Sequence, residues 1–161
     1  MPHPTLHTLA PDFTAPVIGG SYKPGDTLTL SHLRGQGHKV VLYFYPKDDT
    51  PGCTTQACAL RDAWTQISSK AHLFGISPDP IKKHAKFIQK YQLPFPLIAD
   101  DEAHTIATAY GVWVQKQLYG RTYMGVERTT FIIGEDGRIT TILEKVKPAE
   151  HLEKVLSALA S

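Results

Sequence analysis

The two cysteines of the chain, Cys53 and Cys58, lie in one short segment, residues 43–62. This segment runs from an apolar stretch rich in aromatic residues, through a turn with two prolines and a glycine, into a helix-like stretch. A cysteine where a helix begins lies at the positive end of the helix dipole, beside backbone N–H groups that have no intrahelical partner. Those surroundings favour the thiolate, which is the nucleophilic form of cysteine. Cys53 is therefore predicted to be a reactive thiol, and the alternative is an inert thiol buried in the core.

Two elements must position Cys53. Residues 39–45 are a continuous apolar run of β-branched and aromatic residues, which is typical of a central strand buried on both faces. Pro46 ends that run. A helix is predicted from about Thr54 to Ser68, because its apolar residues recur at intervals of three and four.

The rest of the chain alternates between predicted strands and helices. Strands are expected at residues 28–30 and 71–77, and residues 94–100 are expected to be a short strand or an extended connection. An Asp-Gly turn predicts a hairpin of residues 128–133 and 138–143. Helices are expected after an N-cap at Asp79, at 102–109 and from Pro148 onward, with a single turn at 31–34. Residues 1–27 are expected to form turns and short strands. This order predicts one α/β domain, residues 1–161, with a central mixed sheet flanked by helices, as in the thioredoxin fold.

Composition narrows the possible functions. The chain has 161 residues, a net charge of +2 and 42% hydrophobic residues, so it can bury a core, and no nucleic-acid or membrane partner is indicated. No secretory signal or membrane span is visible, which favours a cytoplasmic protein. The eight histidines are scattered and lack the three or four converging ligands of a zinc site, so no metal is predicted.

Pro46, Thr50 and Cys53 form the pattern P-x-x-x-T-x-x-C, which resembles the active-site signature of the peroxiredoxins. The resemblance is to the peroxiredoxin Q branch, also called bacterioferritin comigratory protein. It extends over residues 10–13 (APDF), 30–35 (LSHLRG), 49–58 (DTPGCTTQAC) and 119–131 (YGRTYMGVERTTF). It therefore reaches nearly the whole chain, with a small departure at Thr129, where this branch often has serine.

The resemblance implies a thioredoxin-like fold with an N-terminal extension and the reduction of hydrogen peroxide or organic hydroperoxides. Cys53 would be the peroxidatic cysteine, and Cys58 would resolve its sulfenic acid as an intrachain disulfide. Thioredoxin is the implied reductant, with a glutaredoxin-like protein as the alternative. No metal, flavin or haem is implied, because sulfur carries both electrons. Members of this branch are often monomers, and dimers occur among other peroxiredoxins.

The resemblance also implies roles for the residues around Cys53. Thr50 lies three residues earlier, so its hydroxyl could reach the sulfur or a bound peroxide oxygen. Arg128 would supply a permanent positive charge. Pro46 and Pro51 would restrict the loop and shield the thiolate from bulk water.

The spacing of Cys53 and Cys58 raises a geometric problem. Five residues along an α-helix place the two Cα atoms roughly 8.6 Å apart. Disulfides rarely tolerate more than about 7 Å. We therefore expect the first turns of this helix to unwind after Cys53 is oxidised. In the alternative, Cys58 faces the core and resolves nothing.

Two other functions remain open at this point. The chain could be a thiol–disulfide oxidoreductase or redox sensor on the same fold, although its cysteines lack the Cys-x-x-Cys spacing. It could also be a redox-regulated holdase, whose client binding would not depend on Cys53.

Overall fold

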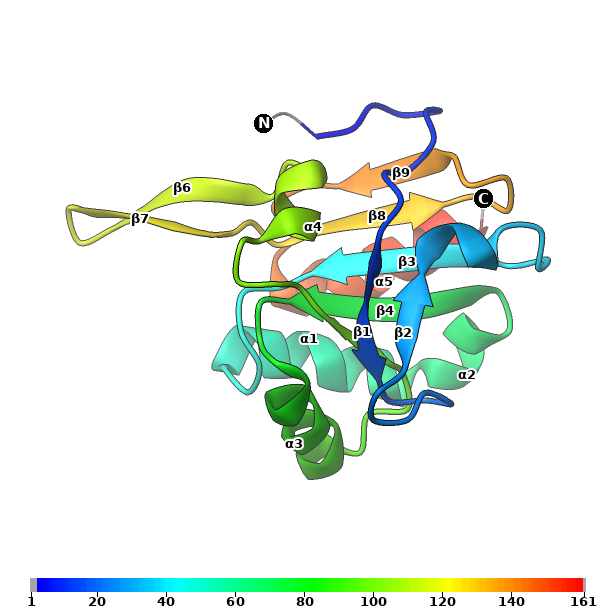
Figure 1. Cartoon of the computed structure of the whole chain (residues 1–161), viewed down its shortest axis with the longest axis horizontal. Coiled ribbons are helices and arrows are strands. Elements are labelled where there is room, and N and C mark those ends of the chain that lie inside the picture. Colours follow the sequence, from blue (N-terminus) through cyan, green and yellow to red (C-terminus); the bar gives the residue numbers. More distant parts are fainter. Residues whose placement is uncertain (1–2, 161) are drawn as a thin grey trace.

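The computed structural model describes residues 3–160. Its main sheet has seven strands in the order β2-β1-β5-β4-β3-β8-β9. The central strand β3 (Lys39–Phe44) pairs in parallel with β4 (Ala71–Ser77) and antiparallel with β8 (Thr129–Ile133). The remaining strands are β1 (Thr14–Ile18), β2 (Thr27–Thr29), β5 (Leu97–Ala99) and β9 (Ile139–Leu143). This mixed sheet between helices confirms the predicted α/β class (Figure 1).

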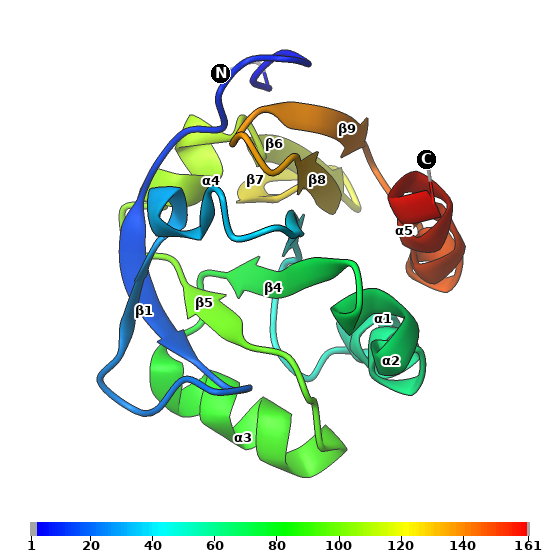
Figure 2. The same cartoon turned by 90° about the vertical axis from the view of Figure 1, so that its right-hand side faces the viewer.

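The sheet has an apolar core on each face, and β3 contributes to both. Val41 and Tyr43 pack in the core shared with α1 (Pro51–Asp62), α2 (Trp64–Ser68), α3 (Ile81–Tyr91) and α5 (His151–Ala160). Leu42 and Phe44 pack in the opposite core, beneath α4 (Thr105–Ala109) and the 3-10 helix η1 (Leu30–Leu33). Figure 2 shows the two sets of helices on either side of the sheet. A strand covered on both faces needs apolar residues on both sides, which explains the uninterrupted apolar run of residues 40–45.

Two helix starts differ from the prediction. The helix expected from Thr54 begins at Pro51, because proline, whose φ is already helical, is well suited to the first turn. The same helix is interrupted at Ala63, which separates α1 from α2. Asp79 does not cap α3: the N-cap is Pro80, and the Asp79 carboxylate instead accepts hydrogen bonds from the backbone N–H of Asp48 and the hydroxyl of Ser77.

Two further boundaries differ. The helix expected at 102–109 is shorter, because α4 begins only at Thr105. The last helix is preceded by a short 3-10 turn, η2 (Pro148–Glu150).

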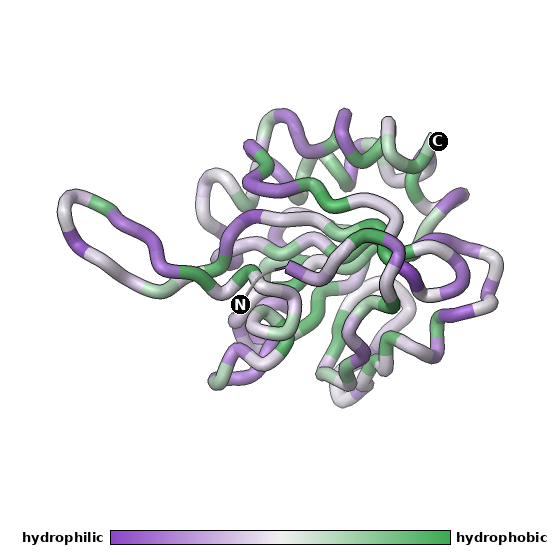
Figure 3. The backbone as a smooth tube through the Cα atoms, turned by 90° about the horizontal axis from the view of Figure 1, so that it is seen from above, coloured by the Kyte–Doolittle hydropathy of each residue, from purple (hydrophilic) through white to green (hydrophobic). Residues whose placement is uncertain are grey.

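A second hairpin was not predicted. Strands β6 (Trp113–Leu118) and β7 (Arg121–Val126) pair only with each other and project from the body (Figures 1 and 3). Tyr119 and Gly120 at its tip both have positive φ, of 51° and 77°, as a tight hairpin turn of this kind requires. No helix within residues 3–160 is long and apolar enough to cross a membrane.

Candidate active site

Cys53 is the third residue of α1 and is almost completely buried, at 2% exposure. The intrahelical hydrogen bond nearest the helix start is donated by Thr54 N–H to the Thr50 carbonyl, at 2.8 Å. The N–H groups of Gly52 and Cys53 precede that bond, and Pro51 has none. The thiol therefore lies at the positive end of α1, as predicted.

Arg128 lies beside the sulfur. Its Nη1 is 3.4 Å from Cys53 Sγ and 2.7 Å from Gln56 Oε1, which accepts a hydrogen bond from it. Its carbonyl accepts from the N–H of Val146, 2.9 Å away. The guanidinium is thus held by one partner on α1 while it faces the thiol. Gln56 was not predicted as a site residue, although its position one helical turn after Cys53 could have indicated it.

Gly52 permits this close approach. A Cβ at position 52 would lie 3.2 Å from both Arg128 Nη2 and Pro148 Cγ, which is closer than most side-chain contacts. A side chain here would force either the guanidinium or Pro148 to shift.

The loop between β3 and α1 carries Pro46 and Thr50. Pro46 is half-buried two residues after the end of β3, and Thr50 is the N-cap residue of α1 without a side-chain capping bond. The Thr50 hydroxyl donates to the Lys47 carbonyl at 2.8 Å. Its proton is therefore engaged, and its oxygen can accept a hydrogen bond from a protonated ligand.

Cys58 lies on the same uninterrupted helix as Cys53, and both are free thiols in this structure. Cys58 is partly exposed. The two cysteines are thus in the arrangement that the helical spacing predicted, in which they cannot bond without a change in α1.

Two further basic side chains near the site were not anticipated. Lys116 on β6 donates to the Val126 carbonyl at 2.5 Å, and burial, followed by the positive charge of Arg128, lowers its pKa. His151 on α5 is fully buried and pairs with the Thr130 hydroxyl at 2.7 Å. Burial, aided by the charge of Arg128, lowers the pKa of His151 to about 3, so its ring is neutral near pH 7.

One other cluster has ligand types suited to a metal. The ligand atoms of Asp48, Asp79 and His84 lie within 4.8 Å of one another. Their polar atoms already bind one another and neighbouring groups of the chain. The cluster is therefore best described as a hydrogen-bond network.

Taken together, the geometry suits nucleophilic attack by sulfur. A thiol at a helix start faces a guanidinium that does not deprotonate, and nearby N–H donors can stabilise negative charge as it moves between ligand atoms. The site is also screened from bulk water, since Cys53 is buried.

Comparison with known proteins identifies the family of the chain. Residues 6–142 match the model of the AhpC/TSA family. The chain is 47% identical to a putative peroxiredoxin bcp of Coxiella burnetii, over 93% of this chain and 95% of the relative. It is 46% identical to peroxiredoxin Bcp of Bacillus subtilis, over 84% and 85% of the two chains.

A solved structure is also similar. The bacterioferritin comigratory protein of Xanthomonas campestris, whose structures bear on its alkyl peroxide reduction activity, superposes with a TM-score of 0.78 at 36% identity, covering 84% of this chain and 85% of that one. This similarity confirms the thioredoxin-like fold. The chain therefore belongs to the AhpC/TSA family, in its peroxiredoxin Q (bacterioferritin comigratory protein) branch, and is a thiol peroxidase.

Proposed function

We propose that this protein is a thioredoxin-dependent peroxidase that reduces hydrogen peroxide and organic hydroperoxides in antioxidant defence in the cytoplasm. The observation that supports this most directly is the position of Cys53 Sγ, in the first turn of α1 and 3.4 Å from Arg128 Nη1. That position combines a nucleophilic sulfur with a fixed positive charge.

In the first step, the Cys53 thiolate attacks one peroxide oxygen. A sulfur–oxygen bond forms, the oxygen–oxygen bond breaks, and the departing alkoxide or hydroxide takes a proton to leave as alcohol or water. The sulfur is oxidised to sulfenic acid by two electrons. Arg128 and the N–H of Cys53 stabilise the shifting negative charge. The Thr50 oxygen accepts a hydrogen bond from the peroxide O–H, while Pro46 and Pro51 limit access of water.

In the second step, the Cys58 thiolate attacks the sulfenic sulfur. A disulfide forms, and hydroxide leaves and is protonated to water. Because both cysteines lie on the continuous helix α1, this step requires the first turns of the helix to unwind. Thioredoxin then returns the pair to thiols by transferring two electrons, and the helix re-forms.

Organic hydroperoxides are included because the related Xanthomonas campestris protein has alkyl peroxide reduction activity. The partial exposure of Cys58 is consistent with access by a protein reductant after the helix opens. We propose that the protein works as a monomer, since one chain contains both cysteines.

Purified protein supplied with thioredoxin, thioredoxin reductase and NADPH tests the proposal. We expect NADPH oxidation on addition of hydrogen peroxide, tert-butyl hydroperoxide or cumene hydroperoxide, and none for Cys53→Ser. Mass spectrometry should find an intrachain disulfide in the wild type and a sulfenic acid in Cys58→Ser. A glutaredoxin system run in parallel identifies the reductant. If the protein reduced disulfides but consumed no peroxide, it would be a thiol–disulfide oxidoreductase instead. If it lacked peroxidase activity but bound unfolded client proteins, and Cys53→Ser bound them equally well, it would be a holdase.

A further inference from the structure

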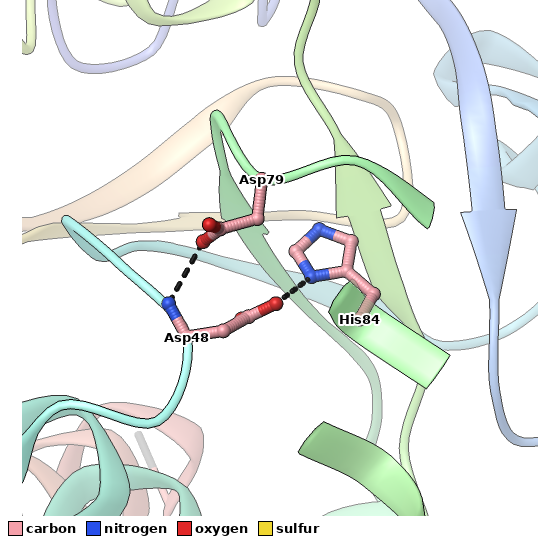
Figure 4. Close-up of side chains that lie close together, drawn as sticks. All are labelled: Asp48, Asp79 and His84. Atoms are coloured by element: carbon pink, nitrogen blue, oxygen red, sulfur yellow. Dashed lines mark hydrogen bonds and ion pairs between the residues drawn. The ribbon is translucent and has the colours of Figure 1, made fainter. Parts of the chain in front are cut away.

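A buried network of charged side chains supports the loop that leads into α1. Figure 4 shows Asp48 from this loop between Asp79, which follows β4, and His84 on α3. The three residues are between 0% and 8% exposed. The Asp48 carboxylate accepts hydrogen bonds from the Tyr45 hydroxyl at 2.5 Å and from His84 Nδ1 at 2.6 Å. The Asp48 N–H donates to Asp79 Oδ2 at 2.8 Å.

The contacts of His84 determine its protonation. Its Nε2 lies 3.0 Å from the Ile98 carbonyl, which can only accept, so Nε2 carries a proton. Its Nδ1 faces the Asp48 carboxylate, which already accepts from Tyr45. A proton therefore lies between His84 Nδ1 and Asp48 Oδ2, and the two side chains form a buried hydrogen-bonded pair. Removing either partner leaves a buried polar group of the other without its hydrogen bond, which is costly.

Asp48 lies two residues before Thr50 in the chain. Between them, Asp49 has a left-handed backbone, with φ of 55°, a conformation that aspartate adopts more readily than most residues other than glycine. The Asp49 carboxylate is held by Lys90 Nζ at 2.8 Å and the Tyr91 hydroxyl at 2.7 Å. Two consecutive aspartates thus attach the loop to α3 immediately before α1 begins.

We propose that His84 is a positioning residue for peroxide reduction, acting through Asp48. Its bond to Asp48 fixes the loop from Pro46 to Thr50, and hence the position of the Thr50 oxygen. In the contacts of this structure His84 binds Asp48 and Ile98, whereas the hydrogen-bond donor to Cys53 Sγ is Arg128. Loss of the pair should therefore leave the thiol reactive while the groups that orient the peroxide are displaced. This inference rests on the proposed function.

The test separates thiol reactivity from peroxide reactivity. In a Cys58→Ser background, stopped-flow kinetics give the rate constant of Cys53 with hydrogen peroxide, and alkylation by iodoacetamide at pH 9 reports the thiolate alone. His84→Asn and Asp48→Asn should each lower the peroxide rate at least tenfold and change the alkylation rate less than twofold. The double variant should be no slower than the slower single variant, because the two residues act as one unit.

A matched control distinguishes positioning from general loss of stability. Leu28→Ala removes a buried side chain from β2, in the core on the other face of the sheet. It should lower the melting temperature and leave the peroxide rate within twofold of the parent. Tyr45→Phe removes only one hydrogen-bond donor to Asp48. It replaces the Asp48 and His84 variants in the test if those do not fold. We expect it to lower the peroxide rate about threefold.

Peroxide rates within twofold of the parent for the folded variants of Asp48, His84 and Tyr45 would overturn the proposal. A metal ion bound stoichiometrically by the parent protein and lost in His84→Asn would also overturn the proposal, because Asp48, Asp79 and His84 would then form a metal site. A parent protein that reacts with peroxide no faster than a free thiol would instead overturn the proposed function itself.

Discussion

Nη1 of Arg128 lies 3.4 Å from Sγ of Cys53, although the two residues are 75 positions apart in the chain. Sheet register explains this proximity. Phe44, the last residue of β3, pairs with Thr129, near the start of β8. The residue before β8 is therefore brought to the edge of the sheet where β3 leads into α1. Any change that shifts this pairing would separate the guanidinium from the thiol.

Substitution of Arg128 should impair peroxide reduction more than thiol alkylation. Arg128→Met removes the positive charge, and we expect the rate of Cys53 with hydrogen peroxide to fall about 10²–10³-fold. Arg128→Lys keeps the charge but lacks the planar guanidinium, whose Nη1 contacts both Gln56 and Cys53, so its rate should be intermediate. Stopped-flow kinetics measure the peroxide rate of each variant, and iodoacetamide alkylation measures the reactivity of its thiol. Arg121→Met, on the exposed hairpin, is the control and should match the wild type.

Gly52→Ala should displace Arg128 without removing any polar group. The added Cβ would lie 3.2 Å from Arg128 Nη2 and from Pro148 Cγ, so one of them must move. We expect a peroxide rate about tenfold lower, corresponding to about 1.4 kcal/mol of transition-state stabilisation. Gly134→Ala meets comparable crowding, at 3.3 Å, away from the site. Equal rates for both variants would show that the space at Gly52 does not matter.

The Thr50 oxygen is expected to act as an acceptor. Thr50→Val preserves shape and removes the hydroxyl, so the peroxide rate should fall about tenfold or more, as for a lost hydrogen bond to a reacting group. Thr50→Ser should remain within about threefold of the wild type. Thr55→Val is the matched control, because the Thr55 hydroxyl also donates to a backbone carbonyl, that of Pro51. If Thr50→Ser were as slow as Thr50→Val, packing of the methyl group would explain the effect instead.

Stability should fall as the pH is lowered below about 6.5. The pKa of His151 is lowered to about 3 in the folded protein, whereas an unfolded histidine has a pKa of about 6.5. Between these values the unfolded chain binds a proton that the folded protein does not. The contribution is therefore fully present above pH 6.5, and its loss at lower pH has a slope of up to about 1.4 kcal/mol per unit.

Urea denaturation of wild type and His151→Gln from pH 7.5 to 4.5 measures this slope. Glutamine can still bond Thr130 but does not titrate, so the variant should show a flatter profile. His72→Gln is a useful comparison, because burial lowers the pKa of His72 as well, on a more exposed side chain. If the free energy of unfolding of His151→Gln changed with pH as steeply as that of the wild type, His151 would not be the source of the pH dependence.

Oxidation should change hydrogen exchange in α1. If Cys58 reaches Cys53 by unwinding, amides of residues 51–60 should lose protection in the disulfide form and regain it on reduction. Cys58→Ser, oxidised to sulfenic acid, should retain protection. Superimposable backbones across residues 50–60 in crystals of the reduced and disulfide forms would contradict the unwinding.

Local sequence patterns predicted much of the sheet. The apolar run at residues 39–45 became β3, residues 71–77 became β4, and the Asp-Gly turn joined β8 to β9 as expected. These elements are specified by patterns within a few residues. The hairpin of β6 and β7 was missed, because its glutamines, lysine and exposed tip carry no apolar alternation that packs against a core.

The candidate site was only partly predictable for a similar reason. The frame of Pro46, Thr50 and Cys53 is contiguous, so its residues could be named from the sequence. The place of Arg128 came from a family resemblance, and its contact with Cys53 depends on the register of β3 with β8. The pairing of Asp48 with His84 joins residues 36 positions apart on different elements, and no local pattern indicates it.

The continuous helix that carries both cysteines links turnover to damage. On the proposed mechanism, a sulfenic acid at Cys53 waits for α1 to open, and during that time a second peroxide molecule can oxidise it irreversibly to sulfinic acid. Substitutions that stabilise α1 would then raise the free energy of unfolding of the protein and also make it easier to inactivate at high peroxide concentrations. Ease of local melting in this one helix would set the oxidant dose that the enzyme survives.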